Sequence, residues 1–539
     1  MSSSSSIDRD HLSFSGAHTN LINGSSSSSS SSSSNIISSN ILLRIFLVTC
    51  QSFLLGYNLA SLNACLVKCG TLNDDGYCSE YPGTIYNDIK LLDNDIQIAT
   101  SLLVIGAWIG CLIGSIPCEI IGRRKTLLLN CFFYIIGGII EGISNKNCLY
   151  IGKLLTGIGT GISSVLCPLL LSEISSIDTR GFITTLHQVN VTIAIFFADI
   201  MGFIFVNNVK HGWVYVQVFT IIPAIIQLIF SMYIPESPKW LLSKGNSDDA
   251  IKQMTLLRPI GYNIQYEYDI LLNDIKSNNN NNNNVATWSD VLQSKRVLLI
   301  GCGLMFFQAI TGINSVILYS TTIFNIAGFN STLLATTLVG LTNVIFTMIA
   351  CKLVDTMGRK ILLLIGLSLM LLSLIVLGIT LLTANKYQTT QGIVSVIMVL
   401  VFIAGFAIGL GAVCWVILSE IMTTRLRSKA MSLFLSINWG SNLIISLFTL
   451  TLINKFGNVN SNNDDMIYKA GQKNGVARLF LVFASFTFIT WLFVFFYVPE
   501  TKGSNPDDQL VKPLLSINDD DNNDNNDNDK SNNSNNDKI

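Results

Sequence analysis

Uncharged polar side chains interrupt the hydrophobic stretch 306–320 (FFQAITGINSVILYS), which belongs to a run long enough to cross a lipid bilayer. Four of them recur at i, i+3, i+7 and i+11 and share one face of an ideal helix: Gln308, Thr311, Ser315 and Tyr319. Asn314 falls off that face, but Gly312 could break the helix and turn Asn314 inward, as broken helices do where they line a cavity. The stretch therefore predicts amide and hydroxyl groups that face the interior of a helical bundle.

These groups carry no charge, which suits a neutral ligand with many hydroxyl groups. An amide both donates and accepts hydrogen bonds, so it can satisfy either side of a hydroxyl that has lost its water. The alternative is a structural role, because Gln and Asn in membrane helices often bond one helix to another. This stretch alone leaves both interpretations open.

The composition predicts a polytopic membrane protein. Of 539 residues, 50% are hydrophobic and only 12% are charged, and the mean hydropathy is +0.50, whereas soluble proteins carry about 25% charged residues. A net charge of −1 gives no reason to expect a nucleic-acid partner. No CxxC or His-rich spacing occurs, so neither a metal site nor a cofactor is predicted.

Twelve hydrophobic runs are candidate membrane spans: 41–63, 96–117, 125–143, 149–171, 185–206, 212–234, 297–320, 332–354, 361–383, 393–418, 429–453 and 477–498. The longest internal gap separates six spans from six. We therefore expect five parts: a disordered Ser-rich tail (1–40), a six-helix half (41–234), a linker with short helices and an Asn run (235–296), a second half (297–503) and a disordered acidic Asn/Asp-rich tail (504–539).

Basic residues cluster in the even-numbered gaps, which predicts cytoplasmic termini by the positive-inside rule. The gap after span eleven fits poorly, because it carries Lys455, Lys469 and Lys473. In the outward gaps, Cys69 and Cys78 could pair, and Asn330 begins a glycosylation sequon. Glycines that recur every four residues predict close helix packing: Gly106, Gly110, Gly114, Gly157 and Gly161.

Three motifs recur in corresponding gaps of the two halves. Residues 119–124 (EIIGRR) return as 355–360 (DTMGRK), and residues 235–239 (PESPK) return weakly as 499–503 (PETKG). Glu173, seven residues before Arg180, returns as Glu420, seven before Arg427. Matching motifs in matching positions indicate two related halves in the same orientation.

The segment from Gln308 to Tyr319 resembles the seventh-helix signature of the sugar porter family of the major facilitator superfamily, usually written QQxxGINxxxYY. Ala309 and Leu318 depart from it. The resemblance implies an all-α fold of twelve transmembrane helices in two pseudo-symmetric halves. It also implies that Gln308 and Asn314 bind sugar and that Tyr319 belongs to a gate.

The same resemblance assigns further sugar ligands: Gln188, Asn343, Trp415, Asn438 and Asn442. An indole ring suits the apolar face of a pyranose. The family's prolines before this Trp are replaced by Leu410, Ala412 and Cys414, so neighbouring glycines would have to supply flexibility.

The resemblance further implies a cytoplasmic salt-bridge network that latches one transport state. Its members would be Glu119, Arg123, Arg124, Glu173, Arg180, Asp355, Arg359, Glu420 and Arg427. Two positions depart from the family motifs: Lys153 stands for Arg, and Ser176 stands for Pro.

Asn58 occupies the position where proton-coupled members usually carry Asp. An amide does not titrate, so uniport is favoured over proton symport, although Asp199 or His187 could reverse this. We therefore expect a transporter rather than an enzyme, one that moves a hexose or related polyol as a monomer in the plasma membrane. A proton symporter and a non-transporting sugar sensor are the alternatives.

Overall fold

The structure is a computed structural model that describes residues 39–67, 78–176, 179–259, 261–280, 288–317, 324, 332–383, 388–421, 427–458 and 465–501. These residues form helices and connecting loops, with no β-strand among them. Tyr319, Asn330 and Cys69 lie outside the described residues, as do the side chains of Asp355 and Arg427.

The first half and the linker contain α1 (Ser39–Ser61), η1 (Asn63–Cys65), α2 (Ile85–Asp88), α3 (Asp93–Ile121), α4 (Arg123–Glu141), α5 (Lys146–Ile174), α6 (Arg180–Asn208), α7 (Gly212–Val218), α8 (Ile221–Ile229), η2 (Ser231–Tyr233), α9 (Pro238–Ser243), α10 (Ser247–Leu257), α11 (Ile264–Asn280) and α12 (Trp288–Gln293). The second half contains α13 (Lys295–Ile310), α15 (Thr332–Met357), α16 (Arg359–Thr383), α17 (Gln388–Phe406), the π-helix η3 (Ala407–Gly411), α18 (Val413–Glu420), α19 (Arg427–Phe456) and α20 (Asp465–Tyr497).

Eleven helical segments in the described part of the chain are long and apolar enough to cross a membrane. They correspond to eleven of the twelve expected spans. The remaining expected span, 125–143, lies on α4, which begins with two arginines and a lysine and ends with Glu141. Charge at both ends shortens its apolar part. With α4, the architecture is the expected fold of twelve transmembrane helices in two halves.

Several expected boundaries were wrong. α6 begins at Arg180 instead of 185, and the last helix begins at Asp465 instead of 477. The sixth span is split into α7 and α8. Hydropathy locates the apolar centre of a helix, whereas polar turns that extend it leave no such signal.

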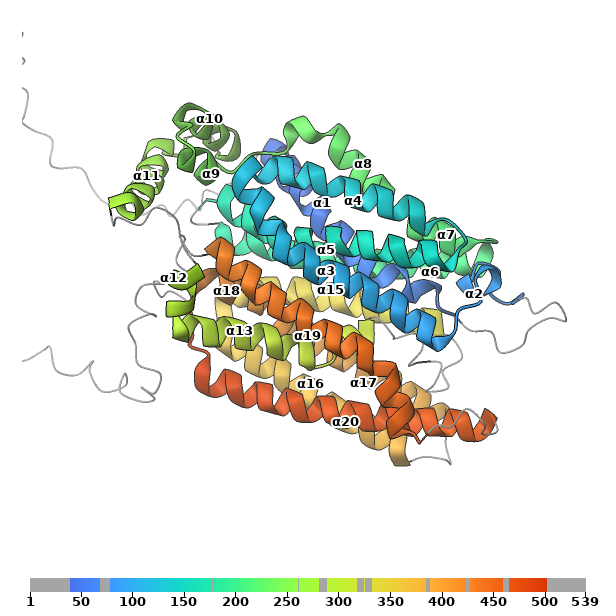
Figure 1. Cartoon of the computed structure of the whole chain (residues 1–539). Coiled ribbons are helices and arrows are strands. Elements are labelled where there is room, and N and C mark those ends of the chain that lie inside the picture. Colours follow the sequence, from blue (N-terminus) through green and yellow to red (C-terminus); the bar gives the residue numbers. More distant parts are fainter. Residues whose placement is uncertain are drawn as a thin grey trace, which may run out of the picture. The chain divides into compact units, whose positions relative to one another are not determined.

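Within each half, neighbouring helices pack pairwise, and two pairs join the halves. α3 packs on α5 and α1 on α6 in the first half, while α16 packs on α20 and α13 on α19 in the second. The helices that meet between the halves are α3 with α19 and α6 with α15. Figure 1 shows α19, in orange, running beside α3, in blue. These two pairs make the largest helix contacts between the halves.

Glycines allow α3 and α5 to approach closely, as the four-residue spacing predicted. A Cβ on Gly110 would lie 2.1 Å from the carbonyl oxygen of Ile158, and one on Gly161 would lie 2.0 Å from that of Ala107. Larger residues would force the two helices apart.

A buried ion pair occupies the interior of the first half. Nζ of Lys153 lies 3.0 Å from Oε2 of Glu141, and both side chains are fully buried. The lysine also donates to Oε1 of Gln217 at 2.8 Å and to Oγ of Ser61 at 3.3 Å. The departure at position 153 therefore keeps a positive charge, and that charge is paired.

The linker helices dock on the end of α5. Arg258, which follows α10, is buried and pairs with Glu267 of α11, with Nη2 and Oε1 2.5 Å apart. The same guanidinium donates to the carbonyl oxygens of Ile174 and Ser175. In the outward loop after α1, Cys78 is disulfide-bonded. Cys69, its partner in the sequence-based hypothesis, lies outside the described residues.

Candidate functional site

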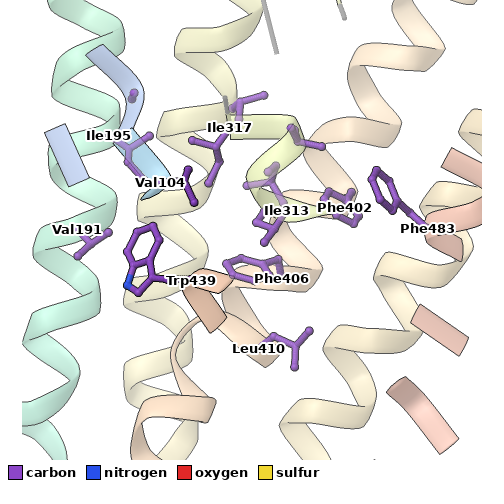
Figure 2. Packing of buried hydrophobic residues seen from close by; sticks show 14 of the residues in the cluster. Val104, Val191, Ile195, Ile313, Ile317, Phe402, Phe406, Leu410, Trp439 and Phe483 are labelled. Carbon is purple, nitrogen blue, oxygen red and sulfur yellow. The ribbon is translucent and has the colours of Figure 1, made fainter. Parts of the chain in front are cut away.

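A cavity between the two halves collects all seven side chains that the sequence nominated as sugar ligands. Its empty volume is about 690 Å³, which includes space open to solvent. The nominated residues that line it are Gln188, Asn343, Gln308, Asn314, Trp415, Asn438 and Asn442. Figure 2 shows part of the apolar wall, with Val191 and Ile195 of α6 on one side and Ile313, Ile317 and Phe406 on the other.

Four amides along one wall form a chain of hydrogen bonds. Asn314 donates to Oδ1 of Asn442 at 2.6 Å, and Asn442 donates to Oδ1 of Asn438 at 3.0 Å. Asn438 in turn donates to Oε1 of Gln308 at 3.0 Å and to the carbonyl oxygen of Met305 at 2.9 Å. Each amide is held in one orientation by its neighbour, so the wall presents fixed donors and acceptors to the cavity.

A break in the seventh helix brings Asn314 into this chain. α13 ends at Ile310, Gly312 has a φ of +89°, and residues 313–317 are helical again. This left-handed backbone conformation favours glycine. A Cβ on Gly312 would also lie 2.5 Å from the ring of Phe483. The sequence-based expectation that Gly312 breaks the helix is confirmed.

Two of the four members of the predicted polar stripe, Thr311 and Ser315, face the interior of the bundle as expected but do not line the cavity. Thr311 is buried and donates to the carbonyl oxygen of Gln308 in its own helix. Ser315 is buried against α19, with its Oγ 2.9 Å from Oγ1 of Thr449. Ser315 therefore has the structural role that the sequence left open, a hydrogen bond between two helices. The break at Gly312 rotates the helical segment that carries Ser315.

A π-helical turn, Ala407–Gly411, includes Leu410, the first of the three positions where the family has prolines. Leu410 lies in this turn, and its carbonyl oxygen accepts a hydrogen bond from Nε2 of Gln308 at 2.8 Å. Single π-helical turns inside α-helices often occur at functional sites, because they release backbone groups from the regular ladder. The turn therefore anchors the last amide of the chain and precedes Trp415.

The opposite wall comes from α6. His187 lies in the cavity lining, and its ring meets that of Trp415 edge-on, with centroids 5.1 Å apart. Its Nδ1 lies 2.8 Å from Oγ of Ser52. The imidazole is therefore both a buried, hydrogen-bonded side chain and a neighbour of the cavity. Gln188 lies more than two turns into α6, deeper than the expected boundary had placed it.

Sequence reasoning missed Trp439, Ser164 and Phe406 in the lining. Nε1 of Trp439 donates to Oγ of Ser164 at 3.2 Å, which joins α19 to α5 across the two halves. Trp439 directly follows Asn438 in the sequence, and an aromatic side chain next to a nominated ligand was the available signal.

Asn58 does not line the cavity. Its Nδ2 donates to the carbonyl oxygen of Leu54 at 2.8 Å and to Oγ1 of Thr220 at 2.7 Å. Asn58 is 1% exposed and lies inside the first half. An Asp there would lose both donated bonds.

The repeated motifs build the same structure twice. Arg123 makes a two-pronged ion pair with Glu173, with Nε–Oε2 and Nη2–Oε1 distances of 2.9 Å. Arg359 pairs with Glu420, with Nη2 and Oε1 2.9 Å apart. Both pairs that the structure describes join helices of the same half.

A third acid completes each copy. Glu236 accepts the backbone N–H groups of Arg123 and Arg124. Glu500 likewise accepts those of Arg359 and Lys360. Sequence reasoning noted this third repeat but did not assign its acids to the network. Burial raises the pKa of Glu236 and Glu420, against the opposing effect of the neighbouring arginines and hydrogen bonds.

The structure also describes three other residues that the sequence nominated for this network. Glu119 is on α3, and its carbonyl oxygen accepts Nε1 of Trp240 at 3.1 Å. Nη2 of Arg124 lies 3.8 Å from the sulfur of Met232. Arg180 is the first residue of α6.

The comparison with known proteins decides the family. A model described as "Sugar (and other) transporter" matches residues 44–509, nearly all of the chain outside the tails. The chain belongs to this family. It is a sugar porter of the major facilitator superfamily, a multi-pass membrane transporter and not an enzyme, as the seventh-helix signature predicted.

Three curated relatives illustrate the breadth of this family. Plastidic glucose transporter 4 of Arabidopsis thaliana is 30% identical over 478 residues, which cover 87% of this chain and 80% of that protein. Putative polyol transporter 2 of the same plant is 31% identical over 448 residues, covering 78% and 83%. The galactose-proton symporter of Escherichia coli K12 is 28% identical over 422 residues, covering 78% and 86%.

Solved structures share the fold. The proton:xylose symporter XylE bound to 6-bromo-6-deoxy-D-glucose has a TM-score of 0.69 at 24% identity, covering 87% of this chain and 98% of that one. A partially occluded inward-open conformation of XylE from E. coli has a TM-score of 0.66 at 23% identity, covering 87% and 100%.

Proposed function

We propose that the cavity binds a hexose or related polyol and that the protein moves it across the membrane by alternating access, down its gradient. The observation that carries this proposal is the composition of the lining. Seven nominated amide and aromatic side chains meet there, and none of the described lining residues is Asp, Glu, Lys or Arg. Such a lining favours a neutral ligand with many hydroxyl groups.

The amide chain supports this ligand class. Asn438 and Asn442 each use the amide oxygen and the amide nitrogen in hydrogen bonds with neighbours. These bonds fix the orientation of each amide, and with it the direction of the lone pairs and N–H groups that remain for a ligand. Trp415 offers a flat apolar surface for the C–H face of a sugar ring. A millimolar dissociation constant corresponds to about −4 kcal/mol, which a few such contacts supply while still permitting release.

The relatives support the same class and broaden it. Their names include a glucose transporter, a polyol transporter and a galactose-proton symporter. Because the relatives include proton symporters, the family alone does not distinguish uniport from proton symport. The local chemistry of this chain has to decide between the two. Asn58 favours uniport, because a buried amide cannot carry a proton.

Proton symport is the second candidate, favoured by the symporters among the relatives. The test is uptake of radiolabelled glucose, fructose, galactose and myo-inositol into proteoliposomes, with and without an inward proton gradient. Uniport requires uptake to stop at equal concentrations inside and outside in both conditions. Accumulation above equilibrium that depends on the gradient would establish symport, and movement of none of the four would contradict this substrate class.

We also propose that the protein acts as a monomer in the plasma membrane with cytoplasmic termini. The distribution of basic residues supports this orientation. Residues 41–234 and 297–503 would then form the halves that rock around the cavity, and 235–296 would link them on the cytoplasmic side.

A further inference from the structure

Asp199 is a buried carboxyl group at a contact between the two halves. It lies on α6, its side chain is 5% exposed, and it makes no hydrogen bond or ion pair with any described residue. On an ideal helix it continues the cavity-lining face of Gln188, Val191 and Ile195, since the four positions follow i, i+3, i+7 and i+11. Asp199 therefore lies on the same face of α6, one turn beyond Ile195, the last residue of α6 that lines the cavity.

The carboxyl group meets the other half at a glycine. A Cβ built on Gly340 of α15 would lie 2.7 Å from Oδ2 of Asp199 and 2.9 Å from Cα of Phe196. Gly340 is one helical turn before Asn343, which lines the cavity. The acid thus occupies space that exists only because position 340 has no side chain, at a contact that must change when the halves rock.

The described parts of the neighbouring elements place no unpaired opposite charge beside this acid. The described part of α15 carries no charged residue before Lys352, twelve residues beyond Gly340. From α1 and η1 come Tyr57, whose hydroxyl donates to the carbonyl oxygen of Val216, and Cys65, which donates to that of Ser61.

Other titratable groups on or beside α6 have contacts of their own, apart from the buried thiol of Cys414 on α18. On α5, Lys153 is paired with Glu141. On α7, the ring of Tyr215 stacks on Phe205. On α6 itself, His187 lies twelve residues before Asp199, about 18 Å along the helix, and it meets α18 there through Trp415.

We propose that Asp199 is a proton-binding site whose protonation controls the contact between α6 and α15. An ionised carboxylate buried without a partner is costly, so the ionised form favours separation of the two helices and access of water. The protonated form favours the packed contact seen here. Because one proton distinguishes the two arrangements, their ratio changes by up to about tenfold per pH unit.

The proton enters and leaves through this same contact, so it regulates the exchange of states without being carried with the sugar. The effect on transport rests on the proposed function, whereas the change in the contact between α6 and α15 does not. Sugar uptake would therefore depend on pH without accumulating the sugar.

The experiment measures the contact directly. Spin labels are attached at Asn208→Cys on α6 and Leu334→Cys on α15, both exposed positions. The partly exposed Cys148, Cys302 and Cys351 are first replaced by Ser. Distances between the labels are recorded by double electron–electron resonance from about pH 8 to about pH 5 in lipid nanodiscs. The distribution is expected to shift to shorter distances as the pH falls.

Asp199→Asn, which is similar in shape and always neutral, is expected to hold the shorter distance at every pH. Asp249→Asn, an exposed control outside the membrane helices, is expected to keep the pH response. Gly340→Ala is expected to lengthen the distance at every pH, since it pushes against Asp199 and Phe196. A distribution that does not respond to pH, or an unchanged response in Asp199→Asn, would overturn the proposal even if sugar transport were established.

Discussion

The carboxylate of Glu500 accepts the backbone N–H of Arg359 at 2.8 Å, although the two residues are 141 positions apart. Glu236 does the same for Arg123, at 2.9 Å and 113 positions away. In each case a glycine with positive φ, Gly358 or Gly122, precedes the arginine and allows the carboxylate to approach the helix start. A carboxylate at a helix N-terminus also interacts favourably with the helix dipole.

Replacement of Glu236 or Glu500 by Ala should therefore destabilise the protein, each by about 1–3 kcal/mol, because N–H groups at a partly buried helix start lose their acceptor. Thermal unfolding of detergent-solubilised protein measures this. Asp249→Ala, at an exposed position, is the control. Unfolding temperatures equal to that of the control would contradict a structural role for the two acids.

Arg123→Ala should cost more than a surface substitution, because Arg123 and Glu173 form a largely buried pair, with side chains 9% and 8% exposed. Removal of one partner leaves a buried charge, at a cost of about 3–5 kcal/mol. Lys252→Ala, from the exposed pair with Asp249, is the matched control and should change little. The same unfolding assay applies, and equal effects of the two substitutions would argue against burial as the cause.

Asn438→Ala should weaken sugar binding about tenfold or more, because it removes the middle of the amide chain and releases Gln308 and Asn442 from fixed orientations. Concentration-dependent uptake in proteoliposomes gives the apparent affinity. Ser441→Ala on the same helix is the control, because among the described residues its hydroxyl donates to the carbonyl oxygen of Ile437 alone. An unchanged affinity and rate at normal protein yield would remove Asn438 from the site.

Gly312→Ala should reduce uptake by moving Asn314, while the side chains on the other walls of the cavity keep their positions. A side chain would strain the positive φ and press on Phe483, and relief of either would move Asn314 away from Asn442. The expected cost is about 1–3 kcal/mol. Gly440→Ala, whose added Cβ would meet only Trp108 at 3.5 Å, is the control. Normal uptake by Gly312→Ala would show that the helix break does not position Asn314.

Asn58→Asp tests the reason given for uniport. The substitution places a titratable group at the position where proton-coupled members usually carry one, and it removes the bonds to Leu54 and Thr220. We expect lower stability together with a dependence of uptake on the proton gradient that the unsubstituted protein lacks. Uptake into proteoliposomes is measured for both proteins, with and without the gradient. Gradient-driven accumulation by the unsubstituted protein would contradict the uniport proposal.

The sequence by itself determined the membrane fold, the twofold repeat and seven of the residues that line the cavity. These properties are recorded locally. Hydropathy over about 20 residues predicts a span, and short motifs such as EIIGRR at 119–124 and DTMGRK at 355–360 identify corresponding positions in the two halves. Even the helix break at Gly312 was predictable, because glycine combined with a misplaced Asn314 is a local pattern.

The tertiary structure decided which polar groups meet. Ser315 and Thr449 are 134 residues apart and bond to each other, whereas Asn314, next in sequence to Ser315, faces the cavity. Asp199 meets Gly340 of the other half. The rotation of each helix about its axis and its neighbours across the chain are set by packing, which sums many weak contacts between distant segments, and no local pattern in the sequence records that sum.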